Sequence, residues 1–236
     1  MFFIFSFAKL INMSLLIRNI LVLPFVLLTF LIFSQNVIQA DKIIQKLCSD
    51  KFAGRGYVDR GDSIAADYIA SYFDSLGLSP INKNYKQSFD ISVNNINSAE
   101  LTIDNRFLTP GIDFLVAPNA PTLSGDYHVF NVSQKMLLSG RIVNKVCKAI
   151  KRGYVPVISV FDSKNQALKN TIVEIKKLSK EGPIIFLREK LTWSVSTSQS
   201  KGMEIWLLDS VFDRFSKDIH INVSSRFMSS YESNNV

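Results

Sequence analysis

Metal-ligating side chains are scarce in this chain. Among its 236 residues there are only two histidines, His128 and His220, and two cysteines, Cys48 and Cys147. Neither histidine is followed at the second position by an aspartate, no two glutamates are adjacent, and no Cys/His spacing is typical of a structural zinc site. Because a catalytic zinc centre needs several His and carboxylate ligands and a nearby base, we predict no catalytic, cofactor-binding or metal-binding residue in this chain.

The histidines and cysteines therefore need structural explanations. Each histidine falls in a predicted strand, between outward-facing positions, so we expect it to be exposed or hydrogen-bonded. Cys48 and Cys147 each fall on the apolar face of a predicted helix. We favour two buried thiols over a disulfide, although export would permit the bond.

Acidic residues are absent from the first 40 positions, where Lys9 and Arg18 are the only charges. An almost unbroken apolar run at residues 20–33 is followed by small and polar residues that end at Ala40. This pattern predicts a secretory signal peptide at residues 1–40, and therefore a secreted or periplasmic protein. The apolar run is shorter than the roughly 20 residues of a membrane-spanning helix, but an uncleaved segment would act as a membrane anchor.

A concentrated basic surface is also missing from the sequence. The whole chain carries a net charge of +7, and loss of Lys9 and Arg18 with the signal peptide leaves +5. Those charges are scattered along the chain, whereas nucleic-acid binding requires a basic stripe with interleaved aromatic residues. We therefore predict no nucleic-acid partner.

The first half of the mature chain is predicted to form a helix, a loop, a second helix and a strand. A short helix is predicted at residues 41–49, followed by a loop at 52–61. We expect Gly54 and Gly56 in this loop to adopt backbone conformations that are closed to other residues. Asp62 is predicted to cap the next helix, which Gly77 ends. A strand follows at residues 85–91, and a tight hairpin turns at Asp104-Asn105. The apolar stripe of the second helix comprises Ala65, Ile69, Tyr72, Phe73 and Leu76.

The second half alternates helices with apolar strands. Because residues 109–124 are rich in Pro, Gly and Ala, we interpret them as a linker. The alternation that follows predicts a small α/β module with parallel strand pairing. Its predicted strands are 127–132, 155–161, 183–187, 191–196, 205–208 and 219–223, and its predicted helices are 141–152, 165–180 and 210–215.

The segment from Leu47 to Phe89 resembles the N-terminal part of peptidase family M28. The resemblance is carried by the Gly-Arg loop at Gly54-Arg55, by a helix that ends in Gly77-Leu78, and by a strand with an aromatic residue and Gln87. Members of that family are zinc-dependent aminopeptidases with an α/β catalytic fold, and many are exported. Residues 125–228 are similar in position to the protease-associated domain that is inserted in such enzymes.

The resemblance implies a partial zinc-exopeptidase fold of two helices and a strand, joined to a small mixed α/β module. We expect a signal peptide at 1–40, the peptidase-like segment at 41–97, a hairpin and linker at 98–124, the protease-associated-like module at 125–228, and the start of the family's catalytic core at 229–236. The family's zinc ligands lie beyond that point, so we expect this chain to be inactive alone. Zinc as cofactor, and peptides or proteins as partners, belong to the full-length parent.

Two other functions stay open. The chain can be a stand-alone exported interaction module without catalytic activity. It can also be an esterase, since Gly61-Asp62-Ser63-Ile64 resembles the nucleophile motif of GDSL-type enzymes, but we find no base for Ser63.

Four polar or aromatic residues have alternative roles. Arg55 and Gln87 are interpreted as anchors of the local backbone, with the lining of a substrate cleft as the alternative. Trp193 and Trp206 are interpreted as packing residues, with a ligand platform as the alternative.

Overall fold

The computed structural model describes residues 36–81, 83–159 and 165–236, and the chain divides into two compact units, residues 1–50 and 51–236. The expected signal peptide falls mostly in residues 1–35, outside the described residues. In the first unit, α2 (Val37–Leu47) confirms the helix expected at 41–49 and already includes Ala40, the expected cleavage point. No helix in the described ranges is long and apolar enough to cross a membrane.

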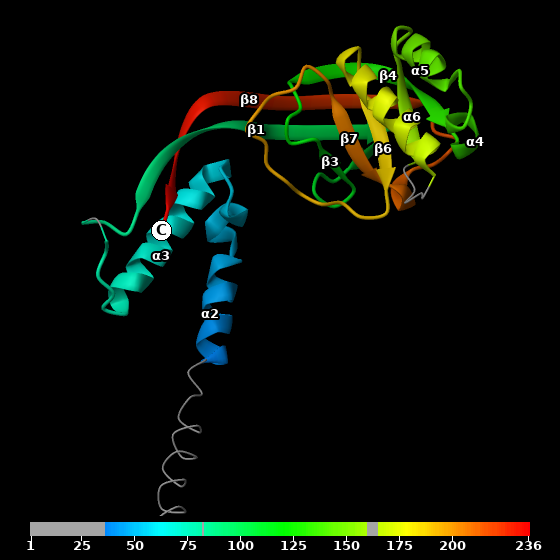
Figure 1. The fold of residues 1–236 in the computed structure, drawn as a ribbon. Coiled ribbons are helices and arrows are strands. Elements are labelled where there is room, and N and C mark those ends of the chain that lie inside the picture. The colour runs from blue at the N-terminus through cyan, green and yellow to red at the C-terminus, as the bar shows by residue number, and fades with distance from the viewer. Residues whose placement is uncertain (1–35, 82, 160–164) are drawn as a thin grey trace, which may run out of the picture. The chain divides into compact units, whose positions relative to one another are not determined.

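The second unit is built on a mixed sheet, which has eight strands among the described residues (Figure 1). The strand order is β2-β1-β8-β4-β5-β6-β7-β3. Strands β4 to β7 run parallel, and the other neighbouring pairs are antiparallel. The predicted α/β fold class is therefore confirmed. The strands are β1 (Gln87–Ile103), β2 (Arg106–Leu108), β3 (Phe114–Val116), β4 (Leu123–Val132), β5 (Tyr154–Ser159), β6 (Ile184–Arg188), β7 (Glu204–Leu208) and β8 (Asp218–Asn235).

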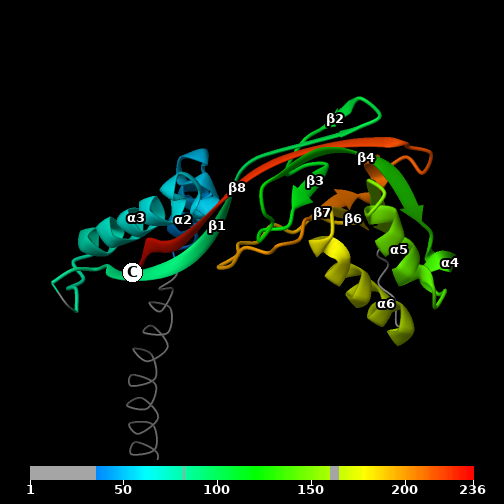
Figure 2. The same ribbon diagram turned by 90° about the horizontal axis from the view of Figure 1, so that it is seen from above.

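Helices α5 (Ile142–Ile150) and α6 (Gln166–Lys177) cover one face of the parallel strands (Figure 2). Their apolar stripes pack on Ile158, Ile184 and Phe186 to form a buried cluster. Both helices were expected from their periodicity, and the parallel pairing of β5 with β6 confirms the predicted helix-strand-helix-strand unit.

The opposite face of β5 and β6 is covered by other strands of the same sheet. Val157 and Ile185 pack there with Leu108 of β2, Phe114 of β3 and Ile221 of β8. Since β2 and β3 are the two edge strands and share this core, the sheet must curl toward itself. Burial on both faces explains why β5 and β6 read as continuous apolar runs.

The hairpin between β1 and β2 is confirmed. Ile103 pairs with Arg106, and Asp104 and Asn105 have φ angles of 47° and 65°, as a type I′ turn requires. Asp104 also holds the start of β8, because its carboxylate accepts hydrogen bonds from the backbone N–H groups of Lys217 and Asp218, each at 3.0 Å.

These two hydrogen bonds from the start of β8 to Asp104, which we call the Asp104 clamp, should weaken in acid. The donated bonds, first from Asp218 and then from Lys217, hold the pKa of the Asp104 carboxyl below its usual range. The folded state therefore binds this proton less tightly than the unfolded state does, so the stabilisation is complete above the unfolded pKa of about 3.9 and is lost as pH falls through the folded value. We expect Asp104→Asn to flatten the acid limb of stability against pH, measured by urea denaturation. Unchanged pH dependence in this variant would contradict the assignment.

Residues 109–124 are part of the core and not a linker. This segment contains β3, which pairs with β7, and Phe114, Ala117 and Ala120 are buried. Proline and glycine correctly indicated turns, but the apolar residues between those turns supply an edge strand. The prediction of a linker was therefore wrong.

Two expected boundaries fall inside single strands. β1 runs through residues 97 and 98, and β8 runs through 228 and 229. Of the shorter predicted elements, residues 191–196 form no strand, and residues 210–215 contribute only to the single turn η4 (Asp209–Val211). Residues 191–196 are mostly exposed, whereas Phe212 in the other segment is buried in the core without belonging to a helix.

The predicted burial of the thiols is also wrong. Cys48 follows α2, in which no residue is buried, and it is exposed. Cys147 lies on α5 beside the buried Val146 and is half-buried.

β1 and β8 form a long antiparallel ribbon (Figure 1). The pairing extends from Ile103 with Ile219 to Gln87 with Asn235, with irregularities between Ile91 and Val93 and between Ile96 and Ser98. The ribbon continues well past the part of β8 that pairs with β4, so β8 has no strand partner on that side beyond Val223 among the described residues.

Helix α3 (Gly61–Ser75) is attached to the far half of this ribbon through Asp62. The Asp62 carboxylate accepts hydrogen bonds from Tyr231 Oη at 2.6 Å and from Ser233 Oγ at 2.8 Å. The N-cap position belongs to Arg60, so the prediction that Asp62 caps the helix was wrong. Its position in the first turn is instead used to join α3 to β8.

Candidate binding groove

The Gly-rich loop before α3 has a strained backbone. Ala53, Arg55, Asp59 and Arg60 have positive φ angles between 42° and 60°, and Gly54 has a φ of 67°. Left-handed conformations cost a non-glycine residue about 1–3 kcal/mol each and cluster at functional sites. The conformational role expected of Gly54 is confirmed, and the strain indicates that this loop is shaped by its surroundings.

Gly56 has a different role from the one predicted, because its φ is not positive. It is buried, and a Cβ atom placed on it would lie 3.4 Å from the ring of Trp193. An added Cβ atom would make only ordinary van der Waals contact with the indole, so this contact does not require glycine, but it shows that the loop and Trp193 pack together.

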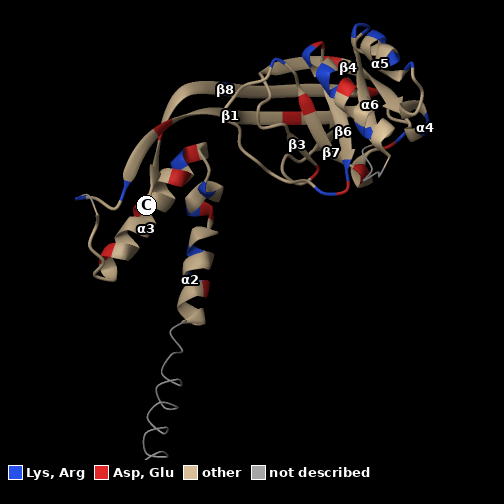
Figure 3. Cartoon of the chain, in the orientation of Figure 1, with Lys and Arg blue, Asp and Glu red and all other residues tan. Residues whose placement is uncertain are grey.

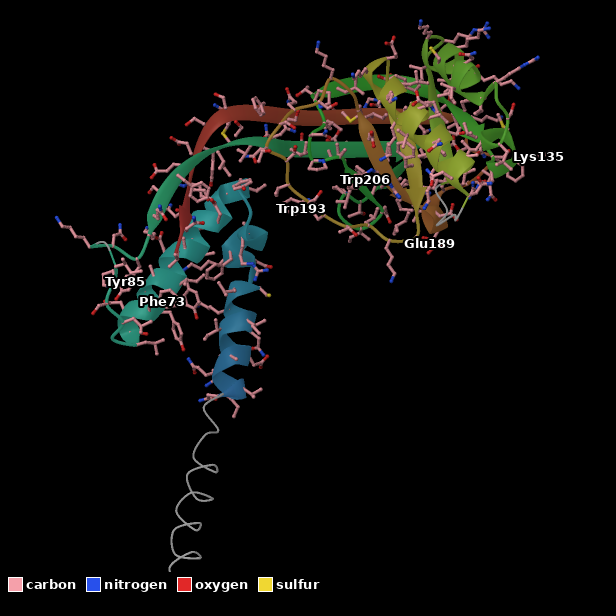
Figure 4. The ribbon with its side chains drawn as sticks, in the orientation of Figure 1. Phe73, Tyr85, Lys135, Glu189, Trp193 and Trp206 are labelled. Carbon is pink, nitrogen blue, oxygen red and sulfur yellow. The ribbon has the colours of Figure 1, made fainter. Side chains whose placement is uncertain are left out.

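Trp193 lies on the loop that leads from β6 to β7, and 59% of its surface is exposed (Figure 4). Trp206 lies on β7 and packs against the cluster beneath α5 and α6. The predicted packing role is therefore confirmed for Trp206, whereas Trp193 is largely exposed and packs at the surface against the loop at Gly56. The segment that carries Trp193 has no strand partner to bury it.

Trp193 lines a groove of about 360 Å³. The groove is mostly apolar, and none of the residues that line it is charged. Trp193 also borders a second recess of about 390 Å³, together with Ala53 and Gly54. The main groove is lined by Tyr57, Val58, residues 94–99 of β1, Pro110, Gly111, residues 114–116, Pro118 and residues 193–195.

Asn94 fixes the end of the groove. Its side-chain Nδ2 donates to the carbonyl oxygens of Pro118 and Ala120 at 2.9 and 3.0 Å, and its Oδ1 accepts from Gln199 Nε2 at 2.9 Å. Its backbone N–H donates to Ser196 O at 3.0 Å. This buried amide therefore ties β1 to two of the three segments that form the other walls, those at 110–120 and 193–199.

Arg55 and Gln87 are not brought together at this groove. Neither residue lines it. Gln87 is exposed at the start of β1, where it pairs with Asn235, and it borders a separate recess of about 610 Å³ near Phe73 and Tyr85 (Figure 4). The interpretation of these residues as a substrate-cleft lining therefore does not apply to the Trp193 groove.

The two histidines form cross-strand pairs with aspartates on β4 and β8. His128 Nδ1 lies 2.7 Å from Asp218 Oδ1, and His220 Nδ1 lies 2.7 Å from Asp126 Oδ1. The side chains of His128 and Asp126 are largely exposed. The expectation that each histidine is exposed or hydrogen-bonded is confirmed.

These residues do not make a zinc centre of the kind that M28 enzymes use. The described part of the chain contains no group of three or more His, Cys, Asp or Glu side chains that could hold a metal ion. Ser63 lies on α3, whereas the two histidines lie on β4 and β8, and no hydrogen bond joins Ser63 to either of them among the described residues.

The sequence did not reveal the groove, because its walls come from four separate segments. Only Trp193 carried a usable signal. It lies in a stretch dominated by serine and threonine, which is typical of an exposed loop and unlike the surroundings of a core tryptophan.

Charged residues lie mainly away from the groove. Figure 3 shows basic residues on α5 and α6, whereas most of the β1–β8 ribbon is formed by uncharged residues. The groove therefore offers no charged side chain for an ionic contact.

Comparisons with known proteins add a likeness among solved structures. The sequence matches no protein-family model and no curated protein significantly. Among solved structures, the fold is similar to that of a peptidase M28 precursor from Shewanella amazonensis, with 10% sequence identity and a TM-score of 0.43. The match covers 83% of this chain and 52% of that protein, so this chain spans about half of its length.

Proposed function

We propose that this chain supplies the N-terminal, non-catalytic part of an exported zinc-dependent aminopeptidase of the M28 type. In this proposal the Trp193 groove binds peptide, and residues outside this chain provide the zinc centre and hydrolyse the peptide bond. The sequence resemblance between residues 47 and 89 supports the family.

The β1–β8 ribbon is the observation that carries the proposal. In this ribbon, β1 leads into the α/β module and pairs with β8, which leads out of it. Asp62 then joins β8 to α3 of the peptidase-like segment. A domain inserted into another fold needs its two ends close together. This geometry is the one expected for a protease-associated-like insertion.

The proposal can be tested by zinc analysis and by assay of the purified chain against aminoacyl 4-nitroanilides. We expect no stoichiometric zinc and no release of nitroaniline. Stoichiometric, tightly held zinc with hydrolysis would overturn the assignment of a non-catalytic role.

The alternative, a stand-alone exported interaction module, uses the same groove and differs only in whether a catalytic partner sequence exists. Sequencing of the DNA that follows the last codon separates the two. A reading frame that encodes an apolar strand followed by His-x-Asp supports the peptidase. The absence of such a frame would favour the stand-alone module.

A further inference from the structure

One edge of β1 is open where it borders the groove. β8 occupies the other edge along nearly the whole strand. On the groove side, β1 pairs with β2 only at residues 101–103, and the backbone N–H of Asn94 donates to Ser196. Between these contacts, residues 95–100 have no strand partner on this edge within the described ranges.

The open edge presents backbone hydrogen-bonding groups. The two-residue turn joins Ile103 to Arg106, so Ile103 directs its N–H and C=O toward β2. Backbone groups alternate along a strand, which places those of Leu101 and then Ala99 on the same edge. The irregularity between Ile96 and Ser98 adds one residue to β1, so the alternation passes from odd-numbered to even-numbered positions there. As a result, the backbone N–H of Asn94, which donates to Ser196, lies on the same edge of β1 as that of Ala99.

The apolar groove lies along these backbone groups. Its lining includes residues 94–99 of β1 together with Leu115, Val116 and Trp193. Its volume of about 360 Å³ falls within the range of about 300–1,000 Å³ that is usual for ligand sites. Backbone hydrogen bonds can supply affinity while a neighbouring pocket accepts alternate side chains, which is how peptides bind by strand addition.

We propose that an extended, uncharged peptide binds as an added strand at residues 95–100 of β1, with an apolar side chain inserted beside Trp193 and Leu115. An open strand edge requires an extended backbone in the occupant, and a lining without charged residues fits apolar side chains. The identification of this peptide as an aminopeptidase substrate rests on the proposed function, but the strand addition itself does not.

The probe is acetyl-Thr-Val-Leu-Val-Thr-amide, titrated into the full chain by isothermal calorimetry. Two isomers with the same side chains serve as matched controls. One is N-methylated at both valines, and the other is N-methylated at leucine and at the second threonine, so each loses two backbone donors of one edge. We expect one isomer to bind about tenfold more weakly or worse, while the other binds nearly as well as the parent peptide.

Variants of the protein provide the second measurement. Trp193→Ala should weaken binding about tenfold, whereas Phe215→Ala, which removes an exposed aromatic residue that does not line the groove, should leave it unchanged. Ala99→Pro removes an edge donor while the ladder to β8 keeps its own bonds, and it should also weaken binding. If Ala99→Pro fails to fold, the methylated peptides still decide the question.

Equal binding of both methylated isomers would overturn strand addition, and so would the absence of binding by the parent peptide. Light scattering that shows a dimer, which the peptide cannot disrupt, would overturn it in favour of pairing between two copies of this chain. None of these outcomes depends on zinc or hydrolysis, so they are distinct from a failure of the proposed function.

Discussion

Replacement of Phe114 by alanine should lower the free energy of unfolding by about 3–5 kcal/mol. The side chain is completely buried on β3, where it packs with Leu108 and with residues of β5 to β8. The substitution leaves a cavity at the point where the edge strand β3 closes over the curled sheet, and the surrounding strands can fill it only in part. Urea denaturation followed by far-UV circular dichroism would measure the loss.

Phe107→Ala provides the matched control. Phe107 lies on β2 and is 83% exposed, so its removal should change the free energy of unfolding by less than about 0.5 kcal/mol. If the two variants were equally stable, residues 109–124 would be a linker after all, and the core described for the second face of the sheet would be wrong.

Asp62→Ala should cost about 2–4 kcal/mol, mostly through local opening of α3. The variant removes the acceptor for Tyr231 and Ser233, and hydrogen bonds to a charged group are worth about 1.5–3 kcal/mol each without being fully additive. Hydrogen exchange should show faster exchange of the amides of α3, with little change in β5.

Two further measurements test whether the opening of α3 is specific to the loss of Asp62. Burial raises the pKa of the Tyr231 phenol, and the hydrogen bond to Asp62 raises it further, so the pKa should fall in Asp62→Ala. Asp67→Ala, which removes an exposed ion pair between α3 and Lys86, should change the free energy of unfolding by no more than about 1 kcal/mol. Equal exchange rates in α3 for the two variants would show that Asp62 does not attach the helix.

The sequence allowed correct prediction of the elements whose partners are local or whose pattern is strong. The type I′ turn at Asp104-Asn105 depends on two residues that tolerate positive φ, and α5 and α6 have stripes that need only a neighbouring sheet. Each of these features depends on residues that lie close together in the sequence. Residue type was therefore sufficient to identify the turn, and periodicity was sufficient to identify the two helices.

The failures share a different cause, which is dependence on residues far away in the chain. Phe114 lies in a segment that resembles a linker, and only pairing with β7 makes it core. Aspartate is a common N-cap residue, and this suggested a capping role for Asp62. Its actual partners, Tyr231 and Ser233, lie on β8, far later in the sequence. The groove needs four segments at once, so no local pattern could predict it.

The β1–β8 ribbon imposes an order on folding. Its strands pair residues as far apart as Ser88 and Asn234, which are separated by 146 positions. Closing such a loop in an unfolded chain is slow, because its entropy must be lost before any contact compensates. Once the module between the strands has folded, Ile103 and Ile219 are already adjacent, and the ribbon can close outward from the Asp104 clamp. We therefore expect helix α3 to dock after the ribbon closes, since its partners Tyr231 and Ser233 lie on the far half of β8.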